Sequence, residues 1–384
     1  MINMINAHTE EIDDPEAAVS ELLAQLDPDN RMLANSVGIV HCFSDFLESG
    51  VVKALCDKLP FDVVGSTTMS VSAPSFISNL GLTLTVLTSD TVKFVSGVSG
   101  PAVDNAEDPV KELYKRVIAP LGQKPVLLMP FIPFLVNLGG DEFIEQIDAL
   151  SGGIPAFGTL PISNEPDYSK SYTIYNGQGY PASLAILALV GDADPVFFSV
   201  SVKEENILKQ KAVVTGISRN ILQSINNMPA VKYLESINMV KNGDVVALNS
   251  LPFIFYLEDG SILVRASIGA AEDGGVILCG AVPLNSTMCL APMDQEDVIN
   301  STADKVREAL RQAQGRGMIM YSCAGRNWAL GARAMAEHEK VGECIAGKAP
   351  YHFAYSGGEI FPSFLDTGKV VNHLQNDSLI ICIL

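Results

Sequence analysis

The stretch MIMYSCAGRN, residues 318–327, holds the strand and the loop from which the fold of this chain can be predicted. Residues 318–321 are apolar and predict a buried β-strand, and the region 329–346 beyond the loop is predicted to be helical. The segment YSGGE at 355–359 then predicts a turn, and the apolar run from Ser378 to Leu384 predicts a closing strand. The unit is therefore a strand, a helix, a glycine turn and a second strand.

The same order of elements occurs twice earlier in the chain. The first copy comprises, in order, 37–42, 46–59, 63–67 and 80–87, and the second comprises 126–129, 143–150, 157–159 and 183–190. Each glycine turn carries hydroxyl residues (Ser66, Thr67 and Thr159), which we expect to stabilise the turns. Strand–helix–strand repeats favour layered packing, so the sequence predicts an α/β fold of layered mixed sheets.

A different pattern separates the second and third copies. Residues 253–257 and 262–268 flank Asp259-Gly260 and predict a β-hairpin, and 276–282 and 288–290 add two strands. This antiparallel block falls in the C-terminal half. We predict a helical lead-in at 1–29, an α/β domain with two repeats at 30–235 and a second α/β domain at 248–384, divided by the polar stretch 235–248.

Three aspartates predict helix starts. Asp14 and Asp108 each precede a proline, which suits the first helical position because it needs no amide hydrogen. The predicted helices run to about Leu26 and about Ile118. Asp294 similarly predicts the start of a helix over 295–314.

The composition excludes several functional classes. The chain has 384 residues, 48% of them hydrophobic, and 25 basic against 44 acidic residues give a net charge of −19. Such an apolar chain is not disordered, and its acidity disfavours binding to nucleic acid or to an anionic membrane surface. The apolar stretch 126–138 is too short for a spanning helix, and residues 1–14 lack signal-peptide features. Seven cysteines without a C-x-x-C pair indicate reduced, buried thiols, so we expect a cytoplasmic protein without membrane insertion.

Motifs for cofactors and metals are missing or incomplete. No G-x-x-x-x-G-K-[ST] motif occurs, and the dinucleotide-like segment 177–182 precedes a strand and contains Pro181. His338 begins a zinc-protease pattern, but the second histidine position is Gly342. The sequence therefore predicts no cofactor, no metal site and no catalytic signature.

The loop Ser322–Asn327 is the main candidate for a ligand site. Its small residues leave backbone amides open before a helix, and the Arg326 fork suits a carboxylate or a phosphate. Glu359, in the second glycine turn, should lie nearby if both segments border one sheet. An arginine for a carboxylate and a glutamate for an ammonium would make a minimal amino-acid receptor. The candidate ligand-binding residues are Cys323, Gly325, Arg326, Asn327, Gly358, Glu359 and Arg265.

The same residues allow other interpretations. Arg326 and Glu359 could form a structural salt bridge, and Arg265 could face solvent instead of the site. An enzyme could use Cys323 as a nucleophile of lowered pKa, with Glu359 or His352 as acid or base. The chain could also be a protein-interaction scaffold that offers a sheet edge or an apolar patch.

The last unit resembles the C-terminal half of FIST-domain proteins (F-box and intracellular signal transduction). It shares YSCAGR at 321–326, SGGEI at 356–360 and NDSL at 376–379, and LVR at 263–265 is also similar. The turn at 64–66, the strand at 80–87 and the segments 220–222 and 227–230 are similar to the N-terminal half of the family. The resemblance spans about residues 15–384.

The resemblance implies an intracellular sensory module that binds a small molecule, with amino acids and small carboxylates as the expected ligands. It implies binding roles for Cys323, Gly325, Arg326, Gly358 and Glu359, and also for Arg265. The chain shows no kinase, chemoreceptor, cyclase or F-box segment. We therefore expect any signal to pass to a separate signalling protein.

Overall fold

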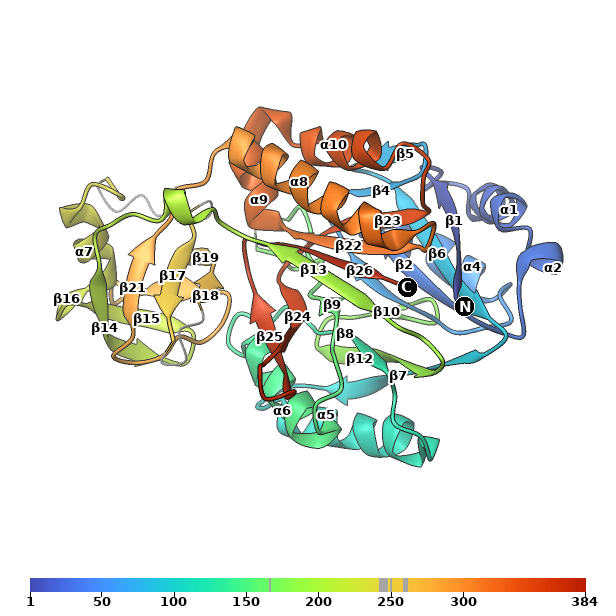
Figure 1. Cartoon of the computed structure of the whole chain (residues 1–384), viewed down its shortest axis with the longest axis horizontal. Coiled ribbons are helices and arrows are strands. Elements are labelled where there is room, and N and C mark those ends of the chain that lie inside the picture. Colours follow the sequence, from blue (N-terminus) through green and yellow to red (C-terminus); the bar gives the residue numbers. More distant parts are fainter. Residues whose placement is uncertain (166, 242–247, 249–250, 258–261) are drawn as a thin grey trace.

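Three six-stranded mixed sheets and one eight-stranded antiparallel sheet make up the described part of the fold (Figure 1). The structure is a computed structural model that describes residues 1–165, 167–241, 248, 251–257 and 262–384. We call the three mixed sheets with their helices the main body, and the antiparallel sheet at 212–290 with its helix the small body. The predicted α/β class with an antiparallel block is confirmed.

The main body consists of three units with one common order of elements. The first unit contains β1 (Asn3–Thr9), α1 (Pro15–Leu26), α2 (Pro28–Arg31), β2 (Asn35–Cys42), α3 (Asp45–Glu48), α4 (Val51–Cys56), β3 (Val63–Thr67), β4 (Val71–Ala73), β5 (Phe76–Ser78) and β6 (Leu82–Ser89). The second contains β7 (Val92–Pro101), α5 (Glu107–Leu113), the π-helical turn η1 (Tyr114–Ile118), the 3-10 turn η2 (Ala119–Leu121), β8 (Leu127–Phe131), α6 (Gly140–Ser151), β9 (Gly158–Thr159), β10 (Thr173–Tyr175), β11 (Gln178–Tyr180) and β12 (Ser183–Gly191).

The third unit is interrupted by the small body. It contains β13 (Val196–Val200), the 3-10 turn η3 (Glu204–Asn206), α8 (Gln295–Ala313), β22 (Met318–Cys323), α9 (Ala324–Leu330), the 3-10 turn η5 (Gly331–Arg333), α10 (Ala336–Ile345), β23 (Tyr351–Ser356), β24 (Glu359–Phe364), β25 (Val370–Gln375) and β26 (Leu379–Ile383). The small body contains β14 (Ala212–Ser218), β15 (Ile221–Ile225), β16 (Met228–Pro229), α7 (Ala230–Ser236), β17 (Phe253–Tyr256), β18 (Ile262–Arg265), β19 (Ser267–Ala270), β20 (Val276–Leu278) and β21 (Thr287–Leu290).

The three units exchange their short hairpins in a ring. The strand orders are β1-β6-β2-β3-β10-β11, β7-β12-β8-β9-β24-β25 and β13-β26-β22-β23-β4-β5. Each sheet therefore ends with a hairpin from another unit: the first sheet takes its hairpin from unit two, the second from unit three and the third from unit one. Within each sheet one pair is parallel, namely β2 with β3, β8 with β9, and β22 with β23.

The glycine turns predicted at 63–67 and 157–159 are wrong, because Gly65 and Gly158 lie in the strands β3 and β9; the need for glycine there is steric. A Cβ atom at Gly65 would lie 1.8 Å from the carbonyl oxygen of Val40, and one at Gly158 would lie 2.0 Å from that of Pro130. The second strand of each parallel pair thus passes directly against the backbone of the first, which only glycine permits.

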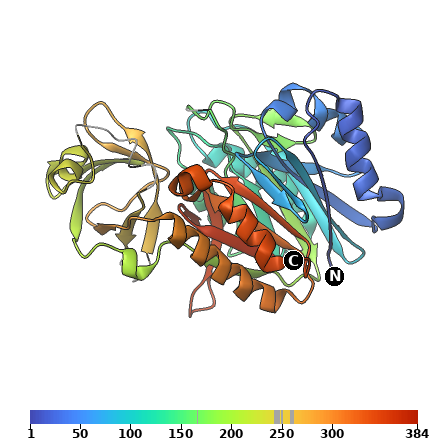
Figure 2. The same ribbon diagram turned by 90° about the horizontal axis from the view of Figure 1, so that it is seen from above.

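A shared apolar core lies between the three sheets. It includes Ile39 of β2, Met129 of β8 and Tyr321 of β22, one from each unit. Helices cover the outer faces: α1 and α4 pack on the first sheet, α5 and α6 on the second, and α8 and α10 on the third (Figures 1 and 2). The apolar strand runs of the sequence are explained by strands buried on both faces.

The small body stands at one end of the main body (Figure 2). The predicted hairpin is confirmed, with Phe253 opposite Arg265, although its turn at 258–261 lies outside the described residues. The predicted single run at 262–268 is two strands, because the chain turns at Ala266 and β19 pairs with β20 at the other end of the sheet order. Strands β14 and β15 were not predicted. The predicted boundary at 235–248 falls partly on residues 242–247, which are not described, and the small body begins before it.

The helix-start predictions hold for two of three aspartates. Asp14 Oδ1 accepts hydrogen bonds from the amides of Glu16 and Ala17, and Asp294 forms a reciprocal capping box with Asp297. The prediction for Asp108 is wrong, since α5 begins at Glu107 and the side chain of Asn105 accepts from the Asp108 amide instead. The predicted helical lead-in also contains β1, an edge strand of the first sheet.

The cysteines agree in part with the expectation of reduced, buried thiols. All seven cysteines are free; four are buried and three are half-buried. Among the described helices, none has the length and hydropathy to cross a membrane.

Candidate functional site

Three predicted site residues of the third unit, Cys323, Gly358 and Glu359, lie where β22 and β23 end. These strands run parallel, with Cys323 opposite Ser356 at their carboxyl ends. The Cys323 amide donates to the carbonyl oxygen of Ser378 at 2.9 Å, so the segment before β26 lies at the same edge. Glu359 begins β24 and pairs with Thr159 of the second unit. The corner between the second and third sheets therefore collects residues from three separate segments.

Glu359 is fully buried, and only one of its two carboxyl oxygens accepts a hydrogen bond from a described residue. Its Oε2 atom accepts from the Ser378 hydroxyl at 2.8 Å, and Oε1 has no hydrogen-bond partner among the described residues. Burial raises the pKa of Glu359 well above its usual value, although hydrogen bonds from Ser378 and Ser356 oppose this. Gly358 lies beside it, where a Cβ atom would come within 3.1 Å of Asn376 Nδ2.

Asp377 is a second buried carboxyl group at this corner. Neither of its carboxyl oxygens has a partner among the described residues, and Asn376 Nδ2 is also unpartnered. Burial raises the pKa of Asp377 to about 7, and the Arg326 guanidinium partly offsets that rise. We call Glu359, Asn376, Asp377 and Cys323 the buried acidic cluster.

The small body completes the surroundings of this cluster with Arg265 and Cys279. Burial, then the charge of Asp377, raises the pKa of the Cys279 thiol, and Arg265 opposes the rise. Arg265 is 3% exposed, and its Nη1 atom donates to the Leu374 carbonyl of the main body at 2.8 Å. The side chain of Arg265 therefore does not face solvent from a strand surface.

A hollow of about 350 Å³ opens beside Arg265 between the two bodies. Its polar lining includes Asp141 of α6, Glu145 and Asn372, together with Arg265 itself. Asp141 Oδ2 accepts from the Ala281 amide at 3.0 Å, and Oδ1 has no partner among the described residues. Arg265 thus lines the hollow and also lies close enough to Cys279 and Asp141 to influence their charges.

Arg326 lies in the first turn of α9, not in an open loop, and it has no exposed surface. It forms an ion pair with Glu337 of α10, with Nη2 2.9 Å from Oε1, and Nη2 also donates to Thr302 of α8 at 2.8 Å. The predicted alternative of an Arg326–Glu359 salt bridge is therefore wrong. Only Nη1 of Arg326 is without a partner among the described residues.

The neighbours of Arg326 in the motif have structural contacts. Asn327 Nδ2 donates to the Ala334 carbonyl at 2.8 Å and so closes the turn between α9 and α10. Gly325 is buried in the first turn of α9. The motif therefore positions the helices beside the cluster, and Arg326 joins three of them.

The chemistry expected of a nucleophilic cysteine is not present at Cys323. Burial, together with the negative charges of Glu359 and Asp377, raises its pKa well above the usual value, which is opposite to the predicted lowering. His352 lies on β23, opposite Ile319 of β22 and four residues before Ser356, and burial in the core lowers its pKa to about 3. The thiol at this corner stays protonated, and the histidine is not beside it.

Charge balance defines what the buried acidic cluster can bind. The positive charge of Arg326 is matched by Glu337, so Glu359 and Asp377 have no full countercharge of their own. Buried carboxylates of this kind must either take up protons or meet a cation. Among the described residues, no group of three or more His, Cys, Asp or Glu side chains has the arrangement of a metal site. Glu359 and Asp377 therefore need either bound protons or a positively charged partner.

Comparison with known protein families identifies the chain. Residues 36–228 match the FIST N domain and residues 230–362 match the FIST C domain. The chain belongs to the FIST family. The resemblance predicted from the third unit is confirmed, and FIST domains are sensor domains of signal transduction. The two FIST matches divide at residue 229, inside the small body, which therefore takes strands from both.

Other comparisons add little to the FIST assignment. A search of curated protein sequences gives no match. Among solved structures, the cyanuric acid hydrolase from A. caulinodans is 9% identical with a TM-score of 0.39, covering 100% of this chain and 99% of that one. PurLQS from Thermotoga maritima is 10% identical with a TM-score of 0.20, covering 100% of this chain and 72% of that one. At these TM-scores neither structure carries an argument about function.

Sequence reasoning on this FIST chain missed several residues of the corner. Asn376 and Asp377 enter the sequence analysis only as part of the family motif at 376–379. Two polar residues directly before a buried strand could nevertheless have indicated site residues at that strand end. Cys279 lies in an apolar run, and Glu337 lies on a helix of mixed composition, so neither had a signal in the sequence.

Proposed function

We propose that this FIST protein is a small-molecule sensor whose ligand carries an ammonium group held by Glu359 and Asp377. The observation that carries the proposal is the pair of buried carboxyl groups whose free oxygens face no partner among the described residues. An ammonium group has three donors and a full positive charge, so it would satisfy both groups at once.

An amino acid or a related zwitterion is the ligand class that fits best. Arg265 Nε donates a hydrogen bond to the Ala281 carbonyl oxygen, and Nη1 donates one to the Leu374 carbonyl oxygen. Its Nη2 atom donates to no described residue. A ligand carboxylate could take the donors of Nη2 at the hollow. Glu359 and Asp377 do not line the hollow, so the proposal requires the ammonium group to extend past Arg265 to reach them. The hollow of about 350 Å³ is of the size that small ligands need.

The position of the cluster supports sensing rather than catalysis. Glu359 and Asp377 belong to the main body, whereas Arg265 and Cys279 belong to the small body. A ligand held by both sides would stabilise one arrangement of the two bodies, and such differential binding is what a sensor needs. A separate signalling protein would then read that arrangement.

A thermal-shift panel of amino acids, simple amines and carboxylic acids tests the proposal. Ligand at a hundredfold excess over its Kd stabilises the folded state by about 2.7 kcal/mol. We expect an amino acid to raise the melting temperature of the wild-type protein and to have no such effect on Asp377→Asn or Glu359→Gln. The exposed Asp366→Asn is the matched control and should respond like the wild type.

Two results would contradict this function. One is that no compound with an amino group stabilises the wild-type protein. The other is that a hit stabilises Asp377→Asn and Glu359→Gln as strongly as the wild type, which would place the ligand elsewhere.

A further inference from the structure

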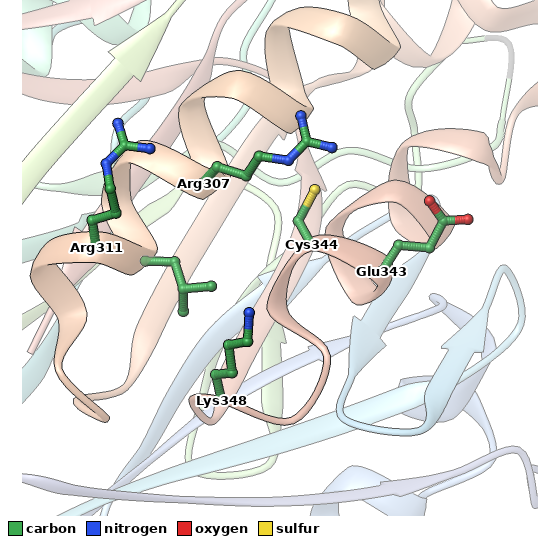
Figure 3. Close-up of a pocket in the computed structure, with 6 residues that line it drawn as sticks. Arg307, Arg311, Glu343, Cys344 and Lys348 are labelled. Atoms are coloured by element: carbon green, nitrogen blue, oxygen red, sulfur yellow. The ribbon is translucent and has the colours of Figure 1, made fainter.

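A second hollow gathers positive charge on this acidic protein. It lies between α8 and α10, has a volume of about 590 Å³, and is lined by Arg307, Leu310, Arg311, Glu343, Cys344 and Lys348 (Figure 3). Three cations and one acid line it, whereas the whole chain has 25 basic and 44 acidic residues. The residues that line this hollow therefore carry a net positive charge, whereas the whole chain carries a net negative charge.

The cations of this hollow are free to meet a ligand. Within the described residues, the one ion pair of Arg307 is an exposed pair with Asp304 at 3.5 Å, three residues away on the same helix. Arg311 and Lys348 form no ion pair in the described part of the chain. Glu343 is instead paired with Lys340 at 2.5 Å, so it neutralises little of the charge in the hollow. Exposed pairs such as that of Arg307 contribute little and are readily exchanged for a better partner.

Helix dipoles account for only part of this arrangement. Cations near a helix C-terminus are favourable, which fits Arg311 in the last turn of α8 and Lys348 after α10. Arg307 lies six residues before the end of α8, beyond the reach of that effect. Its position one helical turn from Arg311 instead places two guanidinium groups on one side of α8.

We propose that this hollow binds a small phosphate ester, with the two arginines and Lys348 holding the phosphate and Leu310 and Cys344 contacting the organic part. Guanidinium groups match phosphate oxygens in pairs, and lysine adds a point charge. Leu310 and Cys344 are half-buried and offer an apolar surface. The volume is in the range of sites for nucleotide-sized molecules.

The site would act on the two helices that Arg326 joins from the inner side. Arg326 contacts Thr302 of α8 and Glu337 of α10, while Arg307 and Arg311 belong to α8 and Lys348 follows α10. A phosphate bridging the outer cations would hold the same pair of helices together. This inference does not depend on the amino ligand proposed above.

Calorimetric titration of the full chain with ADP, AMP, inorganic phosphate and sulfate tests the proposal. We expect the esters to bind the wild-type protein more tightly than sulfate does. Arg307→Gln combined with Arg311→Gln should weaken binding by roughly tenfold or more, since charge-assisted hydrogen bonds are lost. Lys115→Gln, an exposed change on another face, should leave the affinity unchanged.

Each alternative outcome overturns the proposal. Absence of ester binding at millimolar concentration shows that the cations only tune the surface charge. Equal affinity for sulfate and for the esters shows an unspecific anion site. If the double variant does not fold, Lys348→Gln replaces it, and unchanged ester affinity in that variant places the ester elsewhere.

Discussion

Arg326 Nη2 lies 2.9 Å from Glu337 Oε1, and neither side chain has any exposed surface. Glu337 also accepts from Tyr355 Oη at 2.8 Å and from the Ser322 hydroxyl at 3.0 Å. The ion pair is therefore the centre of a buried network that joins α8, α9, α10 and two strands of the third sheet. This is a structural role that the sequence did not reveal for the one arginine of the family motif.

Removing one partner of this pair should be strongly destabilising. Glu337→Gln leaves the Arg326 charge buried without a counter-ion, and we expect a loss of about 3–5 kcal/mol in the free energy of unfolding. The double change Arg326→Met with Glu337→Leu should lose less than the sum of the single changes. Urea unfolding of the wild type, the two single variants and the double variant gives the coupling free energy between Arg326 and Glu337. Losses that simply add would show that the two side chains do not stabilise the fold as a pair.

Asp377 gives stability a dependence on pH that can be tested with one variant. Its pKa is about 7 in the folded protein and ordinarily 3.8, so ionising the buried group costs free energy as pH rises through that interval. We expect Asp377→Asn to match the wild type near pH 4 and to exceed it at pH 8 by up to about 4 kcal/mol. Urea unfolding at both pH values measures this. A constant difference between the two proteins would show that Asp377 does not titrate in this interval.

His352 should act in the opposite direction. Its pKa is lowered from 6.5 to about 3 by burial and, to a smaller extent, by the neighbouring charge of His338, so the folded state favours the neutral ring. The stability that this provides is complete above pH 6.5 and is lost as pH falls toward 3. His352→Phe should therefore lose less stability between pH 7 and pH 4 than the wild type, as measured by thermal melts. Parallel losses in the two proteins would be the contrary result.

Cys323 should be unreactive in the folded protein. It is 3% exposed, and both burial and the neighbouring carboxyl groups favour the protonated thiol. With iodoacetamide at neutral pH, peptide mass spectrometry should find Cys323 unmodified while the half-buried Cys344 is labelled, and both modified after denaturation in urea. Rapid labelling of native Cys323 would restore the enzyme interpretation.

The three-unit organisation could be predicted because its signal is local. Apolar runs such as 318–321 and 183–190 are strands buried on both faces, and the glycine at position 65 of β3 follows from close backbone contact. The exchange of hairpins could not be predicted. Strands such as β4 and β10 have three residues each, and their partners lie in other units.

The site could be predicted only in part, for a similar reason. The prediction brought Cys323, Gly358 and Glu359 to one corner, where the structure places them. It did not identify Glu337 as the ion-pair partner of Arg326, because the packing of α10 is what brings Glu337 next to Arg326. Nor did it assign Asp377, whose side chain is buried by the small body and the strand ends around it.

The hairpin exchange also means that the main body has no intrinsic first unit. Each unit gives a hairpin to one neighbour and receives one from the other, so the three form a closed cycle. Both chain ends reach Gly317: the Leu384 amide donates to its carbonyl oxygen at 2.9 Å, and the Met4 side chain packs directly against it. A circular permutant that joins residue 384 to residue 1 through a short flexible linker and opens within 192–195 would retain every strand neighbour. We therefore expect that folding does not depend on which unit comes first in the chain, because the closed cycle of strand pairs is the same in both arrangements.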